Sequence, residues 1–348
     1  MKSVFLSCVL TVSGLMGGMS QHAFAEPQSV TITPSLRVGD VAHCNVLTTM
    51  VFDMPDQTDR FMSSMVSDAM ISASQRATWT VRRIEPDYSV IMQEFANVQT
   101  ASAETRSMMA DMLLARYKTV IGPMESRVGK SGEIEDILNT GEVVEQFKEL
   151  MKQNAPRMQE ATKEFAKGAA APDAGATAGK MLSEMMNSPE MYEKMVSANI
   201  GKPLFSGAWI WGKTLTVGQP QTSKVPPSEI AFDQVAPGGS VSAERTLTLR
   251  DMNDHEVRVS WVTNMTITIK EPPSADVDTS KWDEKSRQDY QRSRDAMRAA
   301  LEPQRVVETG EMRLDRRTGM PIEGTVVTHG GNSTTSMQMV VVYSPVTK

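Results

Sequence analysis

Apolar and polar residues alternate along residues 76–100 in the pattern of a β-hairpin. In the first run, Ala77, Trp79 and Val81 share one face, and hydroxyl or basic residues occupy the other. A turn is expected at 85–87, where Glu-Pro-Asp separates the two runs. The second run places on one face Tyr88, Val90, Met92, Ala96 and Val98. We therefore predict two antiparallel strands, each with one apolar face.

The same alternation returns at 245–267, and shorter β-forming runs surround both hairpins. Further strands are predicted at 29–36, 38–54, 117–121, 124–128, 134–138, 204–215, 305–314, 321–328 and 335–344. Turns are predicted at 315–319 (DRRTG) and 329–332 (HGGN). In the 204–215 segment, Trp209 and Trp211 would share a face of a strand.

Residues 140–200 show helical periodicity instead. Thr140 can cap a helix that carries one apolar stripe. The stripe consists of Val143, Val144, Phe147, Leu150, Met151, Met158 and Phe165. A low-complexity run at 168–179 predicts a flexible linker, and further helices are predicted at 104–116, 180–186, 189–198 and 280–301.

These elements predict an α+β protein of mostly antiparallel sheet, curved or barrel-like, with helical insertions. The predicted divisions are a targeting segment (1–25), a first β-rich half (26–139), a Met-rich helical insertion (140–200) and a second β-rich half (201–348). The halves share a constant offset of 167 at three pairs: Asp87 and Asp254, Val90 and Val257, Asn97 and Asn264. An internal duplication explains this order of features, and convergent hairpin patterns are the alternative.

The N-terminus has the form of a secretory signal. Lys2 precedes an apolar run, and Ala23-Phe24-Ala25 fits a small-residue cleavage site. We therefore expect an exported protein of a bacterial periplasm. The remaining cysteine, Cys44, has no intramolecular partner after cleavage and is expected to be buried in a strand.

The composition excludes some classes of binding partner. The formal net charge is −6 and the charges are interspersed, which argues against a nucleic-acid partner. No stretch approaches the roughly 18 apolar residues of a spanning helix, so we expect a chain that does not span a membrane. No P-loop, dinucleotide fingerprint or nucleophile elbow occurs, and no cofactor is predicted.

The strand-turn-strand segment Leu314-Asp315-Arg316-Arg317-Thr318-Gly319-Met320-Pro321 resembles one found in uncharacterised exported bacterial proteins with duplicated β-rich halves. The resemblance covers mainly the two β-regions. It implies an envelope protein built on long antiparallel sheets, and it implies no catalytic residues.

Most of the 27 methionines lie between Met50 and Met195. Five of them crowd one predicted helical stretch: Met181, Met185, Met186, Met191 and Met195. Structural packing is the first interpretation, because methionine fills irregular gaps. The alternatives are a surface for an apolar ligand or a protein partner, and a thioether site for Cu(I).

The function predicted from these features is a non-enzymatic cell-envelope protein that binds or carries an apolar small molecule or lipid. The alternatives are a structural partner of another envelope protein and a hydrolase without a recognisable motif. The mature histidines (His43, His255 and His329) lack metal-ligand spacing, which argues against zinc.

Overall fold

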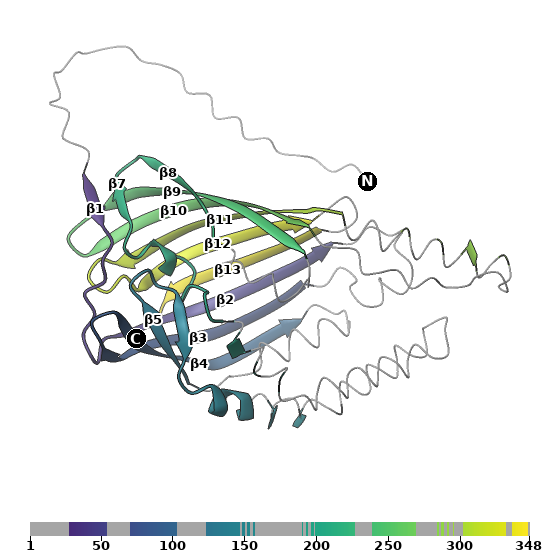
Figure 1. Ribbon diagram of the computed structural model, residues 1–348, viewed down its shortest axis with the longest axis horizontal. Helices are drawn as coiled ribbons and strands as arrows, with labels where there is room; N and C mark the ends of the chain where they lie inside the picture. The colour runs from purple at the N-terminus through teal and green to yellow at the C-terminus, as the bar shows by residue number, and fades with distance from the viewer. Residues whose placement is uncertain are drawn as a thin grey trace, which may run out of the picture.

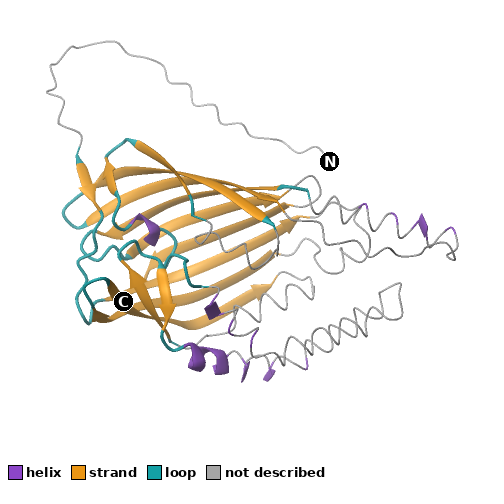
Figure 2. Cartoon of the chain, in the orientation of Figure 1, coloured by secondary structure: helices purple, strands orange, loops and turns teal. Residues whose placement is uncertain are grey.

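The computed structural model describes residues 28–53, 70–102, 123–146, 199–226, 239–268, 302–331 and 336–346, with isolated positions in 148–197 and 284–295. Most of these residues belong to one 11-stranded antiparallel sheet, in the order β6-β5-β4-β3-β2-β13-β12-β11-β10-β9-β8. Figures 1 and 2 show its long strands lying side by side. A second sheet contains only β1 (Ser29–Thr31) and β7 (Thr214–Thr216).

The strands of the large sheet are nearly all consecutive in sequence. The first group is β2 (Val41–Asp53), β3 (Met70–Ile84), β4 (Tyr88–Ser102), β5 (Met124–Gly129) and β6 (Ile134–Ile137). The second group is β8 (Pro220–Lys224), β9 (Ser240–Met252), β10 (Glu256–Thr268), β11 (Gln304–Asp315), β12 (Pro321–Gly331) and β13 (Ser336–Pro345). The two groups meet where β2 pairs with β13.

The prediction of a mostly antiparallel, β-rich protein is confirmed, but the barrel-like closure is not. In the described ranges, β6 and β8 are edge strands, so the sheet is open. Each group is a simple meander, and a meander arises from hairpin connections whether or not the halves are duplicated. The structure does not show a duplication. Helical residues in the described ranges are few: the 3-10 helix η1 (Ala208–Ile210), residues 140–146 and isolated positions.

The sheet curves, and one face carries the core. We call this the inner face; in Figure 1 it is the side against which β1, β7 and η1 lie. Trp79, Trp261, Met312 and Tyr343 are buried on it, from four different strands. The strand ends at the hairpin turns around 85–87, 253–255 and 316–319 form the turn-side end of the sheet. We call the opposite end the loop-side end.

An irregular segment, residues 201–213, fills the turn-side end of the inner face. We call it the plug. A strand was predicted at 204–215, and this prediction is wrong for residues 204–213; only its last two residues belong to a strand, β7. Gly201, Gly207 and Gly212 have φ of 81°, 100° and 77°, in a region that interrupts extended backbone. The chain instead makes tight turns that bury both Trp209 and Trp211.

Aromatic side chains link the plug to both sides of the sheet. Phe205 packs edge-on against Trp79 of β3, with ring centroids 5.7 Å apart, and against Trp211 at 6.0 Å. Trp209 packs edge-on against Trp261 of β10 at 5.3 Å. The plug therefore bridges strands that lie far apart in the sheet, and its burial accounts for much of the core.

Glycines provide the space for these rings. A Cβ on Gly310 of β11 would lie 2.1 Å from Trp261 Cζ2, and one on Gly319 would lie 2.6 Å from Trp211 Nε1. The Trp211 indole also donates a hydrogen bond of 3.1 Å to the Gly319 carbonyl oxygen. The predicted turn at 315–319 is confirmed, and its glycine, Gly319, contacts the Trp211 ring of the plug.

Two local predictions are wrong, the first for a reason of register. Val81 pairs with Ile91 and Trp79 pairs with Gln93, so the inner face of β4 carries Ile91 and Gln93, not Val90 and Met92. Register shifts between Val81 and Arg83, and between Ser74 and Arg76, break the simple alternation. Similarly, residues 329–331 of the predicted HGGN turn continue β12.

The start of the helix at residue 140 is also displaced by one position. The Val143 N–H donates to the Asn139 carbonyl oxygen at 3.1 Å, so Asn139 occupies the capping position predicted for Thr140. The predicted signal segment, the 168–179 linker and the elements at 104–116 and 117–121 lie outside the described residues. The helix predicted at 280–301 is described only at isolated positions.

Candidate functional site

The inner face differs between its two ends. At the turn-side end, Val259 and Met312 are fully buried beside the plug. Further along toward the loop-side end, Ile267 and Val306 are still buried, but several other apolar side chains are only half-buried. Four of these we call the loop-side methionines: Met50, Met265, Met337 and Met339.

Strand register brings the loop-side methionines into one region. Met339 of β13 lies directly opposite Met50 of β2. On the other side, Met265 of β10 lies opposite Val306 of β11, which in turn lies opposite Gly330 of β12. None of the four belongs to the continuous core of the described residues. They form an apolar surface distinct from the plugged core, made of side chains that adapt readily to an irregular partner.

A line of polar side chains crosses the inner face between these two regions. We call Arg245, Thr263, Glu308 and Thr328 the polar row. Pairing places Arg245 opposite Thr263, Thr263 opposite Glu308, and Glu308 opposite Thr328. The next residue in the row, opposite Thr328, is Met339. The polar row therefore runs directly into the loop-side methionines.

Two residues of the polar row contact tryptophan side chains at the plugged end. The Arg245 guanidinium lies 3.8 Å from the centroid of the Trp209 ring, and its Nε donates to Thr263 Oγ1 at 3.0 Å. Trp261 Nε1 donates to Glu308 Oε1 at 2.8 Å. Thr328 is 6% exposed, and its hydroxyl oxygen has no hydrogen-bond partner among the described residues. A buried hydroxyl without a partner costs free energy, which a polar ligand group could recover.

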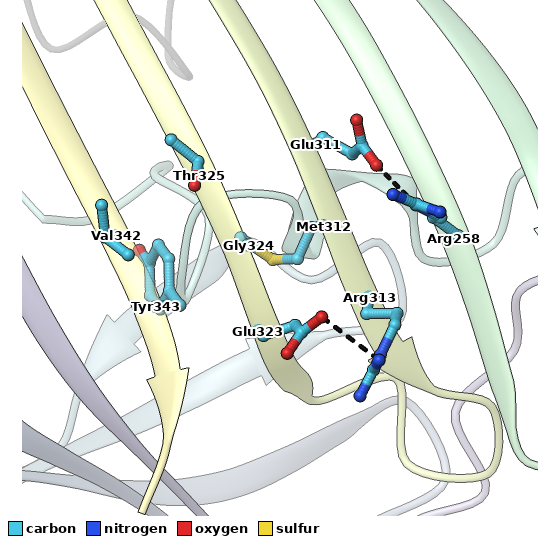
Figure 3. A pocket seen from close by; sticks show the side chains of 9 residues that line it. All are labelled: Arg258, Glu311, Met312, Arg313, Glu323, Gly324, Thr325, Val342 and Tyr343. Carbon is cyan, nitrogen blue, oxygen red and sulfur yellow. Dashed lines mark hydrogen bonds and ion pairs between the residues drawn. The ribbon is translucent and has the colours of Figure 1, made fainter.

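A hollow lies on the outer face and is drawn in Figure 3. Its volume is about 280 Å³. Charged side chains of three strands surround it: Arg258, Glu311, Arg313 and Glu323. Arg258 is ion-paired with Glu311, and Arg313 Nη1 lies 3.2 Å from Glu323 Oε1. Because each arginine already faces a carboxylate, the hollow offers no excess positive charge to an anion.

Two titratable groups on the inner face have raised pKa values because they are buried. Burial raises the pKa of the Cys44 thiol to about 11, and its Sγ donates to the Pro321 carbonyl oxygen at 3.2 Å. Burial also raises the pKa of Tyr343, whose hydroxyl donates to Ser206 Oγ of the plug at 3.1 Å. Both groups are held neutral near pH 7, which suits a core more than a reactive site.

The five methionines singled out from the sequence (Met181, Met185, Met186, Met191 and Met195) lie outside the described side chains. The burial predicted for Cys44 in a strand is confirmed. His255 lies at a turn, as predicted, while His329 lies in β12. Within the described ranges, no group of three His, Cys, Asp or Glu is arranged to hold a metal, and no helix is long and apolar enough to cross a bilayer.

Sequence reasoning did not find the loop-side methionines, although a signal was present. Alternation in the predicted strand at 335–344 already places Met337, Met339, Val341 and Tyr343 on one face. The polar row carries no comparable signal, because its four residues come from four strands and meet only through register.

Comparisons with known proteins give no family. No family model matches the chain, and no curated protein matches it. Among solved structures, one described as "lipid-protein interactions in lipovitellin" matches with a TM-score of 0.36 and 8% sequence identity. The match covers 90% of this chain, which spans only 26% of the lipovitellin chain. A similarity at this level carries no argument about function.

Proposed function

We propose that this protein is a non-enzymatic carrier of the bacterial cell envelope, which holds an apolar or amphiphilic molecule against the loop-side inner face of its sheet. The observation that carries the proposal is the half-buried surface of the loop-side methionines beside a plugged core. An antiparallel sheet that simply faces water alternates apolar and polar residues, with the polar side exposed. Here the inner face is apolar again beyond the polar row, at the loop-side methionines, which favours an apolar occupant.

The chemistry of the surface supports a ligand of variable shape. Methionine side chains are unbranched and polarizable, and they line surfaces that accept several related apolar molecules. The plug closes one end of the inner face, so a long ligand would lie along the strands with one end against the polar row. Small-molecule sites of this kind combine a largely apolar lining with few polar groups.

Native mass spectrometry of the full chain, expressed in bacteria and purified from the envelope fraction without detergent, tests the proposal. We expect a retained mass of lipid size. Met339→Glu, which places a charge on the loop-side inner face, should lose that mass. Gln338→Glu is the matched control, since it places the same charge one residue along β13 on the opposite face, and it should retain the mass. Protein that carries no such mass, and binds no apolar dye, contradicts the proposal.

A second function, docking to another envelope protein, is favoured by the outer face. The apolar side chains of Leu47, Val51, Val262 and Val307 are between 38% and 42% exposed there. The same experiment separates the two proposals, because a protein mass that remains bound in Met339→Glu and is lost in Gln338→Glu, which lies opposite Val51, indicates a partner on the outer face.

A further inference from the structure

We infer that the polar row binds the head group of an amphiphilic ligand, and that this head group is uncharged and carries a hydroxyl. The inference rests on the proposed function, because it assigns one end of the ligand whose apolar part lies on the loop-side methionines. It is carried by a separate observation, the buried Thr328 hydroxyl that has no partner among the described residues.

The position of Thr328 connects the two parts of such a ligand. Its side chain lies between Glu308 on β11 and Met339 on β13, on the same face of the sheet. A hydroxyl of the ligand could accept from Thr328 Oγ1 and donate to the Glu308 carboxylate. The apolar chain attached to that hydroxyl would then continue over Met339 and Met50, which pair directly.

The charges of the polar row favour a neutral head group. The row contains one cation, Arg245, and one anion, Glu308. Arg245 stacks on Trp209 and donates to Thr263, while Glu308 accepts from Trp261 through Oε1. An anionic head group at Thr328 would lie next to the Glu308 carboxylate, which repels it. A hydroxyl meets no such repulsion and can both donate and accept.

Hydrogen bonds to a buried partner make this recognition selective. A site whose buried polar group is satisfied only by the ligand discriminates against a ligand that lacks the matching group. One such bond contributes about 1 kcal/mol, which corresponds to about a fivefold change in affinity. We therefore expect the full chain to bind dodecanol several times more tightly than dodecane or dodecanoate.

Displacement of bound Nile red from the full chain by dodecanol, dodecane and dodecanoate measures this preference. Thr328→Val keeps the shape of the side chain and removes the hydroxyl. It should weaken dodecanol binding about fivefold and leave dodecane binding unchanged. Thr325→Val is the matched control, because Thr325 is exposed on the outer face of the same strand, and it should change neither affinity. Thermal unfolding of both variants checks that they fold.

The outcomes distinguish failure of the carrier function from failure of the head-group assignment. If none of the three compounds displaces the dye from the wild-type chain, the carrier function fails and the head-group assignment falls with it. If all three bind equally and Thr328→Val changes nothing, the head-group assignment alone is overturned. Tighter binding of dodecanoate than of dodecanol also overturns it, since that result assigns the site to an anion.

Discussion

The two ends of the inner face are built from the same strands but have different surroundings. At the turn-side end, the plug seals the sheet, and Val259, Trp261 and Met312 are at most 2% exposed. A few residues along the same strands, beyond the polar row, the loop-side methionines are half-buried. Strand alternation alone therefore does not distinguish a core from a binding surface. What distinguishes them is whether another part of the chain packs over the strand.

The largest expected effect comes from opening the plugged end. Phe205→Ala removes the ring that packs against both Trp79 and Trp211. Because the side chain is buried and leaves a cavity, we expect a loss of about 3–5 kcal/mol in the free energy of unfolding, measured by urea denaturation. Met339→Ala is the control from the loop-side end. A smaller loss is expected there, and equal losses would contradict the difference between the two ends.

A smaller effect is expected from the glycine beneath Trp261. In Gly310→Ala the added Cβ meets the indole at 2.1 Å, so the ring must shift within the packed core. Overpacking of this kind costs about 1–3 kcal/mol, which urea denaturation can measure, and it should alter the Trp fluorescence spectrum. In Gly141→Ala the added Cβ meets no atom within 4 Å, so stability should be unchanged or slightly higher. A neutral Gly310→Ala would show that Trp261 is not fixed against β11.

The elements predicted well are those in which local pattern and tertiary context agree. The alternation of apolar and polar residues located the strands of both hairpins, because each hairpin buries one face against the plug. It failed on β4, because the pairing with β3 shifts between Val81 and Arg83 and so places Ile91 instead of Val90 on the inner face; no residue in the sequence marks that shift. It also failed on the plug, because a run rich in Trp, Leu and Ile favours a strand when its glycines are ignored.

The candidate site was less predictable than the fold. The sequence predicted a candidate surface at the five methionines between Met181 and Met195, because these methionines lie close together along the chain. The loop-side methionines cluster only in space, through the pairing of β13 with β2 and of β10 with β11. The polar row depends on four strands in register. Long-range pairing of this kind is set by the whole sheet and leaves no local signature in the sequence.

The smallest effect on stability is expected from a partly exposed ion pair near the turn at 315–319. There Asp40 accepts two hydrogen bonds from Arg317, at 2.8 and 2.9 Å. These bonds hold the pKa of Asp40 below its ordinary value of 3.8. The pair therefore stabilises the fold above pH 3.8, and this contribution is lost as the pH falls through the lower folded pKa. Asp40→Asn should slightly lower the thermal midpoint at neutral pH and converge with wild type in acid.

Asp87→Asn is the matched control for that prediction. Asp87 is 92% exposed and lies 3.5 Å from Lys130, so its loss should have no measurable effect on the thermal midpoint. If Asp40→Asn is less stable than wild type by a margin that does not change with pH, the Asp40–Arg317 pair is not the cause.

If a ligand covers the loop-side inner face, it protects thiols placed there, and thiol labelling measures this protection. In a Cys44→Ala background, Met339→Cys and Val340→Cys place a thiol on the inner and the outer face of β13. We expect dodecanol to slow maleimide labelling of the Met339→Cys variant several-fold and to leave the labelling rate of the Val340→Cys variant unchanged. Equal labelling rates with and without dodecanol in the Met339→Cys variant, under conditions where dodecanol binds, would contradict this expectation.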